Sequence, residues 1–285
     1  MASRIAKASL VAGVVFAMAE ISLGALVGYY PLNELNGTAE GDLVTDASGN
    51  SRNMQIFSDD DPPVLPQQGI ASANAALYGT AYSFNTPADA LNYADTVTGS
   101  FSGSGLTRDS ALTYAAWIKP AANQISLPTI LGSNGRGYDF RIAPSGSDWS
   151  VVLSAGNNSF AISSAATIES DVWTHVAVTK DVNGSSGTNR SSVNFYINGV
   201  LVESGDVGRT TITQSPVRFF VGTGSQITQY YSGGIDEARI YNEVLDASTI
   251  AGLAIVPEPC SLSLASMGLI LAGSQLRKRG KRHEV

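Results

Sequence analysis

Apolar residues in the middle of the chain fall in short stretches that are separated by Gly, Asn, Asp, Ser and Pro. Several stretches alternate apolar and polar side chains, and almost none repeats apolar residues at the helical period. Alternation places successive side chains on opposite faces of a strand, and the separating residues favour turns. The pattern therefore predicts an all-β protein in which two antiparallel sheets pack as a sandwich.

The clearest hairpin is expected around Asn198 and Gly199. The strand before this dipeptide alternates so that Val193, Phe195 and Ile197 share one face, and a second apolar stretch follows it directly. An Asn-Gly pair suits a type I′ turn because both residues accept a positive φ. The segment therefore predicts a two-stranded unit with one apolar face.

Three longer strands are expected elsewhere, at residues 112–119, 173–180 and 232–241. Trp117 and Trp173 lie in the first two of these strands and are expected to be core residues. A short helix is expected at 247–253. Asp246 is its expected N-cap, because an aspartate in this position accepts hydrogen bonds from amides of the first turn.

Residues 1–24 have the three parts of a secretory signal peptide. Arg4 and Lys7 give a positive region, residues 8–19 form an apolar stretch, and small residues after it offer a cleavage site. A permanent N-terminal membrane helix is the alternative. It is disfavoured because Glu20 ends the apolar stretch after about twelve residues. The sequence therefore predicts export.

The C-terminal residues 256–285 read as a sorting tail. Pro257, Glu258 and Pro259 lead into a mostly apolar stretch of 17 residues, and the basic cluster 277–282 follows it. Such a stretch rises roughly 25 Å as a helix, against a hydrocarbon core of about 30 Å, and the basic side chains can snorkel to a headgroup surface. Basic residues after an apolar segment keep that end in the cytoplasm, so the preceding residues would face outward. A single-pass anchor and a buried C-terminal helix are the alternatives.

This order of motif, apolar stretch and basic end resembles the PEP-CTERM sorting signal of Gram-negative bacteria. The resemblance covers about thirty residues. It implies recognition by an exosortase-type processing enzyme, contact with the membrane before processing, and cleavage near the Pro-Glu-Pro motif. It also implies delivery to the cell envelope, the cell surface or the extracellular matrix. Cys260 departs from the small or hydroxyl residue that is usual directly after the motif.

The residues between the two ends, 25–255, are expected to form one domain. They carry 21 acidic and 10 basic residues, so their net charge is about −11. Nucleic-acid binding depends on neutralising phosphates with Lys and Arg, so this class of partner is excluded. The single cysteine, Cys260, lies in the tail. The domain therefore has no disulfide and must be stabilised by burial.

Six segments in sequence order resemble a laminin-G-like, concanavalin A-like jelly-roll domain. They are residues 30–34, 46–50, the strand with Trp117, and residues 173–177, 195–199 and 233–245. The resemblance implies a two-sheet antiparallel jelly-roll sandwich over essentially the whole mature domain. It also implies lectin-like binding of carbohydrate or matrix components, although such sandwiches also serve as glycoside hydrolases and passive structural domains.

Hydrolysis of a glycosidic bond needs two carboxyl groups that face one cleft. Asp236 and Glu237 are the nearest approach to such a pair, but strand alternation places adjacent side chains on opposite faces. His175 is the only histidine within 25–255, and its place in a strand favours a packed residue over a catalytic base. We therefore expect a protein without enzymatic activity.

Calcium is the metal ion that the domain sequence favours. Asp46 and Asn50 flank a glycine-bearing loop that offers the hard oxygen ligands of Ca²⁺. In some jelly rolls of the resembled type a structural ion joins the first loop to the last strand, which would add Asp236 to the ligands. The alternative is that Asp46 and Asn50 shape an Asx turn and that Asp236 accepts hydrogen bonds from backbone amides.

Trp149, Tyr230 and Tyr231 are the candidate residues for carbohydrate binding. They follow polar stretches and are the aromatic residues least explained by strand alternation. An aromatic face can pack against a sugar ring while polar neighbours bind its hydroxyls. The alternative is that Trp149 begins a strand and covers one end of the core, while one tyrosine packs and the other is exposed.

These features together predict an exported, non-enzymatic protein of the cell surface or extracellular matrix of a Gram-negative bacterium. Its jelly-roll domain is expected to bind polysaccharide or other matrix components. Two alternatives stay open: a structural matrix component without a specific ligand, and a glycoside hydrolase of the concanavalin-like fold.

Overall fold

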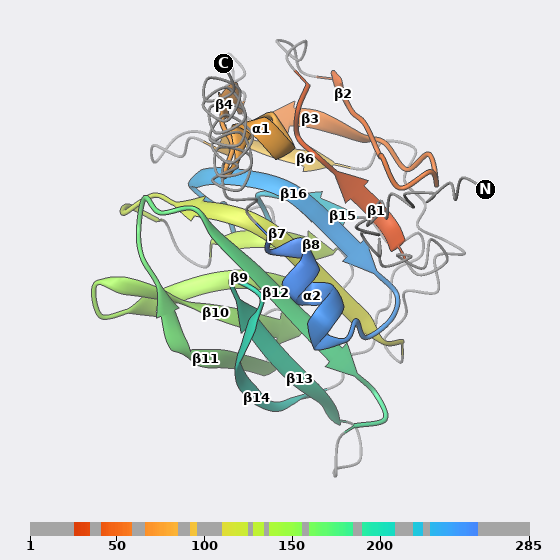
Figure 1. Cartoon of the computed structure of the whole chain (residues 1–285), viewed down its shortest axis with the longest axis vertical. Coiled ribbons are helices and arrows are strands. Elements are labelled where there is room, and N and C mark those ends of the chain that lie inside the picture. The colour runs from red at the N-terminus through yellow and green to blue at the C-terminus, as the bar shows by residue number, and fades with distance from the viewer. Residues whose placement is uncertain are drawn as a thin grey trace, which may run out of the picture.

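A computed structural model of the chain describes residues 26–34, 41–58, 66–84, 92–95, 110–124, 128–133, 137–155, 160–184, 190–208, 219–224 and 229–255. The predicted signal peptide and the predicted sorting tail, with Pro257, Glu258 and Pro259, lie outside the described residues. Within the described ranges the chain forms two antiparallel sheets and two short helices, so the predicted all-β jelly-roll sandwich is confirmed (Figure 1).

The first sheet, sheet A, has the order β14-β13-β12-β7-β16-β5-β4, and β1 also pairs with β16. Its strands are β1 (Leu26–Tyr30), β4 (Gln67–Ala71), β5 (Thr80–Phe84), β7 (Leu112–Pro120), β12 (Thr174–Asp181), β13 (Arg190–Ile197), β14 (Val200–Gly208) and β16 (Gly233–Tyr241). The last strand in the sequence therefore lies near the centre of the sheet, between strands from the first half of the chain.

The second sheet, sheet B, has the order β11-β10-β9-β8-β15-β6-β3-β2. Its strands are β2 (Leu43–Val44), β3 (Met54–Ser58), β6 (Asn92–Asp95), β8 (Thr129–Ser133), β9 (Tyr138–Ser145), β10 (Asp148–Ala155), β11 (Phe160–Ile168) and β15 (Phe219–Val221). The helices are α1 (Ala75–Tyr78) and α2 (Ala247–Leu253). Neither of these described helices has the length and apolar character needed to cross a membrane.

The main core lies between the sheets and follows from strand alternation. In β7, Tyr114, Ala116 and Ile118 point into this core. In β13, Val193 and Phe195 do the same, as the hairpin pattern predicts. Burying a large apolar side chain contributes about 1.5–3 kcal/mol, so these alternating positions hold the two layers together.

A second apolar cluster lies on the outer face of sheet A, the face turned away from sheet B. Here α2 packs Ile250 and Leu253 against Ala115 of β7 and Ala177 of β12, and Figure 1 shows the helix lying across the sheet. Asp246 is the N-cap of α2, as predicted, since its Oδ1 accepts a hydrogen bond from the Thr249 amide at 2.7 Å. Both faces of the middle of sheet A are therefore buried.

Trp117 is buried as predicted, although on the outer face of sheet A, whereas Trp173 is only half-buried and differs from its prediction as a core residue. Trp117 alternates with Ala116 and Ile118 and so points to the outer face, where only 4% of it is exposed. Trp173 is half-buried and also lies on the outer face. Alternation alone does not distinguish the two faces of a strand when both faces are covered.

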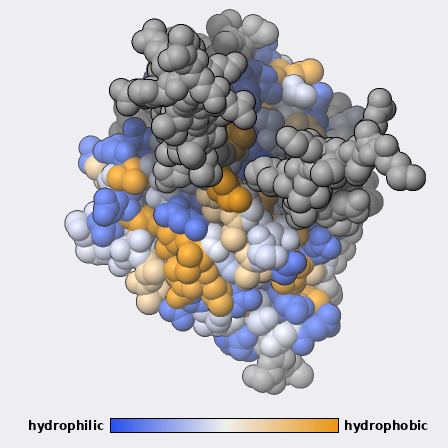
Figure 2. All heavy atoms as spheres, viewed as in Figure 1, coloured by the Kyte–Doolittle hydropathy of each residue, from blue (hydrophilic) through white to orange (hydrophobic). Residues whose placement is uncertain are grey.

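Apolar side chains are also exposed beside α2. Val200 and Leu201 of β14 are 64% and 50% exposed, and Figure 2 shows an apolar area on the face that carries α2 and β14. Isolated apolar residues on a surface are common. This area by itself indicates no specific partner.

Candidate functional site

A cavity of about 320 Å³ opens on the outer face of sheet A, near the first residues of β16. We call it the outer-face cavity. It is lined by Ile70, Ala71, Ser83, Phe84, Lys119, Ala121, Asp171, Ser232, Gly233 and Gly234. Small-molecule sites usually have volumes of about 300–1,000 Å³, so this cavity is large enough for a small ligand.

The floor of the cavity is a cross-strand row. Gly234 of β16 pairs with Ser83 of β5 on one side and with Lys119 of β7 on the other. Gly233 has a φ of +125°, and a Cβ atom there would lie 2.2 Å from the Lys119 carbonyl oxygen. The two adjacent glycines therefore place no side chain of their own on this row, and Ser83 and Lys119 flank it on either side.

Trp173 forms an apolar edge beside this floor. A Cβ atom at Gly234 would lie 2.7 Å from a carbon of the indole ring, so the ring rests on the bare strand. The indole Nε1 donates a hydrogen bond to the Ala71 carbonyl oxygen at 3.2 Å. Trp173 directly precedes β12, and this hydrogen bond joins its side chain to the end of β4, an edge strand of sheet A.

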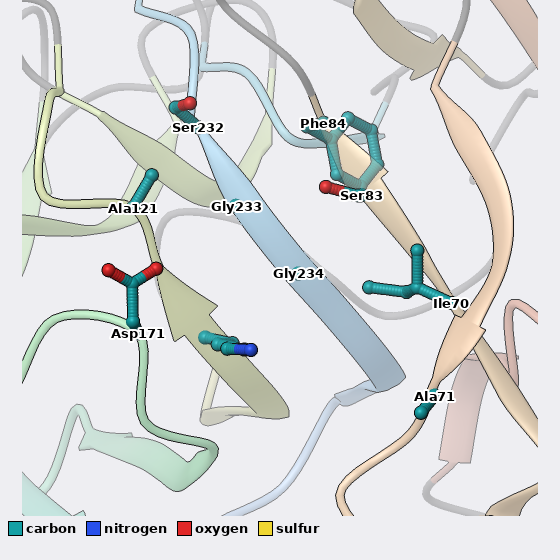
Figure 3. A pocket seen from close by; sticks show the side chains of 10 residues that line it. Ile70, Ala71, Ser83, Phe84, Ala121, Asp171, Ser232, Gly233 and Gly234 are labelled. Carbon is teal, nitrogen blue, oxygen red and sulfur yellow. The ribbon is translucent and has the colours of Figure 1, made fainter.

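Asp171 supplies the acidic group of the cavity. Its φ is +60°, an uncommon conformation that Asp tolerates better than most residues. Its amide donates a hydrogen bond to the Pro120 carbonyl oxygen at 2.7 Å, and its side chain is exposed. Figure 3 shows Asp171 on one side of Gly233 and Gly234, with Ile70 on the other. The cavity thus offers a carboxylate, an amine, hydroxyls and apolar surface within one small space.

A buried polar row lies two residues further along the same strands. Asp236 of β16 pairs with Trp117 of β7, which pairs with His175 of β12. Asp236 is fully buried, and its Oδ2 accepts a hydrogen bond from the Ser72 hydroxyl at 2.5 Å. Its Oδ1 accepts one from the Glu237 amide at 2.8 Å. Burial raises the pKa of the Asp236 carboxyl to about 7.

His175 shares this row without forming a catalytic arrangement. It is fully buried and packs edge-on against Trp117, with ring centroids 5.5 Å apart. Neither ring nitrogen has a hydrogen-bond partner within the part of the chain that the structure describes. Burial lowers the pKa of His175 to about 3, so the ring is neutral at physiological pH.

Glu237 belongs to a closed charge cluster beside this row. It sits at a β-bulge with a φ of +52° and is 2% exposed. Its carboxylate accepts hydrogen bonds from the Tyr29 hydroxyl at 2.7 Å and from the Arg239 guanidinium. That guanidinium lies 4.3 Å from the centroid of the Tyr29 ring, and burial raises the pKa of the Tyr29 hydroxyl. Both carboxylates of the Asp236–Glu237 pair are therefore enclosed and face no open cleft.

The predicted calcium loop is held by its own hydrogen bonds. The Asp46 carboxylate accepts hydrogen bonds from the Tyr29 amide at 3.0 Å, the Ser48 hydroxyl at 2.8 Å and the Arg52 amide at 2.9 Å. The Ser48 amide also donates to it at 2.9 Å, which is the Asx turn named as the alternative. Asn50 turns its Nδ2 toward the Leu26 carbonyl oxygen at 2.8 Å.

The three predicted calcium ligands thus belong to separate networks, since Asp236 bonds Ser72 while Asp46 and Asn50 fix the first turn to β1. Among the described residues no group of three or more His, Cys, Asp or Glu side chains could hold a metal ion. Ca²⁺ takes about six to eight oxygen ligands, and the Asp46 oxygens already accept four N–H or O–H donors. The described donor set does not fit a calcium centre.

The predicted sugar-binding aromatics are placed differently from expectation. Trp149, Tyr230 and Tyr231 are 7%, 2% and 0% exposed, and Tyr231 belongs to the main core. Trp149 lies in β10 of sheet B, where its Nε1 donates a hydrogen bond to the Ser170 hydroxyl at 2.9 Å. In this structure the three rings are enclosed and present no open face to a ligand.

Sequence reasoning missed the outer-face cavity and the residues at and beside it. Trp173 was assigned to the core, and Lys119 and Asp171 were given no role. The available signal was the pair Gly233 and Gly234 within a strand, because glycine inside a strand often marks a close approach of another group or a ligand. What the pair could not indicate was that the indole of Trp173, the residue directly before β12, would lie over it.

Comparison with protein families gives one match. A family model described as the concanavalin A-like lectin/glucanases superfamily matches residues 92–251, more than half of the chain. The matched segment includes β7, β12 and nearly all of α2. No curated protein sequence matches the chain.

Solved structures include several with this fold. Domain 4 of AbnA, a GH43 extracellular arabinanase from Geobacillus stearothermophilus, in complex with arabinotriose, is 22% identical with a TM-score of 0.56, covering 81% of this chain and 98% of that chain. A structure of botulinum neurotoxin type C, whose cell entry is described as dependent on interaction with two ganglioside molecules, is 18% identical with a TM-score of 0.54. The match covers 84% of this chain and 52% of that chain. The binding domain of Paraclostridial Mosquitocidal Protein 1 is 16% identical with a TM-score of 0.52, and the match covers 81% of this chain and 52% of that chain. The chain spans about half the length of these two toxin chains, and at such identities the likeness shows the fold alone.

Proposed function

This chain belongs to the concanavalin A-like lectin/glucanases superfamily, and on that premise we propose that it is a non-enzymatic carbohydrate-binding protein of the cell surface or extracellular matrix. The observation that carries the proposal is the outer-face cavity of sheet A. Two structural neighbours, domain 4 of AbnA and the type C neurotoxin, are described together with glycans, which supports the same class of ligand.

The cavity has the mixed chemistry that a sugar requires. Lys119 and Asp171 offer a charged donor and a charged acceptor for hydroxyl groups, and Ser83 adds a neutral hydroxyl. Trp173 supplies apolar surface at the edge, where the C–H groups of a sugar ring can pack. Because the lining includes one cation and one anion, the site suits an uncharged sugar better than an acidic one.

The proposal of a non-enzymatic role is supported by the two adjacent carboxylates of β16. Asp236 and Glu237 are 0% and 2% exposed, and each is engaged by neighbouring side chains. A glycoside hydrolase needs both carboxyl groups in contact with substrate or water. Release of reducing ends from a β-glucan or an arabinan by the purified protein would contradict this part of the proposal.

Export and sorting belong to the same proposal. The leader 1–24 would direct secretion, and the tail 256–285 would hold the chain at the membrane until an exosortase-type enzyme processes it near Pro257–Pro259. The finding expected on cell fractionation is the domain in the envelope or matrix, shortened at both ends. The intact polypeptide in the cytosol would contradict it.

Binding is tested on a broad glycan array that includes arabino-oligosaccharides, with the purified full-length chain. Trp173→Ala and Asp171→Asn should each weaken retention by about tenfold, a loss of about 1.4 kcal/mol. Asn tolerates the positive φ at position 171, so the second variant removes the charge without adding strain. Val200→Ala is the control, because Val200 is exposed on β14 and does not line the cavity.

Two outcomes of the array separate the remaining possibilities. If no glycan is retained, the chain is a structural matrix component without a specific ligand. If retention disappears with a chelator and returns with Ca²⁺, the ion is part of the binding state and the predicted calcium ligands must rearrange.

A further inference from the structure

A residue next to the cavity lining is hydrogen-bonded to the carboxyl group of Asp236, which does not line the cavity. Ala71, at the end of β4, lines the cavity, and its neighbour Ser72 points away from it. The Ser72 hydroxyl donates a hydrogen bond of 2.5 Å to Oδ2 of Asp236, which is fully buried. A ligand in the cavity therefore cannot touch the Asp236 carboxylate.

The same wall is tied to Trp173 from the other side. The indole Nε1 of Trp173 donates its hydrogen bond to the carbonyl oxygen of Ala71. Two successive residues are thus hydrogen-bonded to two different elements. Ala71 accepts a hydrogen bond from the segment before β12, and Ser72 donates one to β16. Displacing either residue moves the acceptor that orients the indole ring.

Asp236 and the segment that contains Ser72 are each held by further contacts. Asp236 is fixed by the Glu237 amide and lies beside Trp117 in the strand register. The wall continues into α1, where the Tyr78 hydroxyl donates to the Ile255 carbonyl oxygen at 2.7 Å. The segment 71–78 is therefore attached to the outer face at both ends, with the cavity at its first residue.

We propose that Ser72 and Asp236 are positioning residues of the ligand site, which fix the Ala71 carbonyl and through it hold the Trp173 ring at the edge of the cavity. This inference rests on the proposed function, because it concerns the recognition surface of that same cavity. Neither residue touches the ligand. Their effect is to keep the aromatic surface in one orientation before binding, which lowers the ordering cost of recognition.

The first test needs no ligand. The chain has three tryptophans, so a full-length protein labelled with 5-fluorotryptophan gives three ¹⁹F resonances, assigned by single Trp→Phe variants. Ser72→Ala should shift or broaden the Trp173 resonance and leave that of Trp149, in sheet B, unchanged. Ser72→Thr keeps the hydroxyl and should restore the wild-type signal of Trp173.

A matched control removes an exposed serine hydroxyl on β14. Ser204→Ala deletes a hydrogen bond of similar length, 2.7 Å to Asn194, at a site that does not line the cavity. It should leave the Trp173 resonance in place. A Trp173 resonance that is identical in wild type, Ser72→Ala and Ser72→Thr would overturn the proposal.

Asp236 is tested with two variants of different chemistry. Asn keeps one acceptor oxygen for the Glu237 amide, and its NH₂ group can donate to the Ser72 oxygen, so Asp236→Asn should preserve the Trp173 resonance. Asp236→Ala removes both contacts and should reproduce the effect of Ser72→Ala. If Asp236→Ala does not fold, the Ser72 pair of variants decides the question alone.

The second test measures affinity with arabinotriose as the probe. Ser72→Ala should weaken binding about three- to tenfold, mainly through faster dissociation, and Ser72→Thr should restore it. Unchanged affinity in a variant whose Trp173 resonance has moved would overturn the positioning role. If wild type does not bind arabinotriose and the array retains no other glycan, the proposed function fails, while the ¹⁹F result still decides whether Ser72 positions Trp173.

Discussion

His175 and Asp236 occupy the same buried row, and burial moves their pKa values in opposite directions. The pKa of His175 falls to about 3 and that of Asp236 rises to about 7, because burial disfavours the charged form of each group. Both side chains are therefore neutral in the folded protein between these values. Their contributions to stability change with pH in opposite senses and partly cancel in the wild type.

Replacing His175 should expose one of these contributions. A folded pKa below the unfolded value of about 6.5 gives stability that is present above pH ~6.5 and lost as the pH falls toward ~3. Between about pH 7.5 and pH 4.5 the free energy of unfolding should fall by about 3 kcal/mol more in wild type than in His175→Phe. Urea denaturation at the two pH values measures this difference. Equal losses in the two proteins would show that His175 becomes charged without leaving its site.

Replacing Asp236 should expose the other contribution. Its folded pKa lies above the unfolded value of about 3.8, so its stabilisation is complete below pH ~3.8 and is lost as the pH rises through ~7. Asp236→Asn stays neutral and should be more stable than wild type at about pH 8, by at most about 4 kcal/mol, with a smaller gain at about pH 5. Thermal melts across this range check the result. A variant less stable than wild type at about pH 8 would indicate that the ionised carboxylate is the preferred hydrogen-bond acceptor.

Among the elements, the β13–β14 hairpin links local sequence to helix packing. Asn198 and Gly199 have φ values of +49° and +78°, as a type I′ turn requires. A Cβ atom at Gly199 would lie only 2.8 Å from the Cα atom of Ala251 in α2. The turn therefore supports α2 in addition to joining two strands.

This contact predicts different costs for two turn glycines. Gly199→Ala should destabilise the protein by about 2–4 kcal/mol, from backbone strain of about 1–2 kcal/mol and from the clash with α2. Gly146→Ala is the matched control, because Gly146 has a φ of +67° and open space around it. It should cost only the strain. Equal losses in chemical denaturation would mean that α2 shifts without cost.

Sequence patterns were sufficient to locate the elements that are specified by their own alternation or capping residues. Alternation located β7, β12 and β16 to within about two residues, and the capping aspartate located α2. The patterns failed where burial comes from distant segments. Tyr230 and Tyr231 follow a polar stretch, yet long-range packing encloses both rings. Likewise, the cavity depends on an indole and a strand that are about 60 residues apart, a relation that no local pattern contains.

For the whole molecule, the domain should fold without residues 256–285, the predicted sorting tail. Within the described residues the chain ends in α2, which packs through Ile250 and Leu253, and Ile255 accepts a hydrogen bond from Tyr78. Deleting 256–285 should therefore leave a β-rich protein with a cooperative melt by circular dichroism. A longer deletion that starts at Asp246 removes α2 and should lower the melting temperature, because it uncovers the apolar cluster on sheet A. A molten or aggregated product from the shorter deletion would contradict the domain boundary.

Because β16 lies near the centre of sheet A, this sheet cannot be completed until β16 has formed. β1 is paired only with β16 among the described strands, and the β4–β5 hairpin joins the rest of sheet A through the same strand. A chain that emerges from its N-terminal end first must hold these early strands without their partner until more than 230 residues have appeared. The early strands of sheet A therefore acquire their full set of neighbours only after β16 has formed, almost at the end of the described chain.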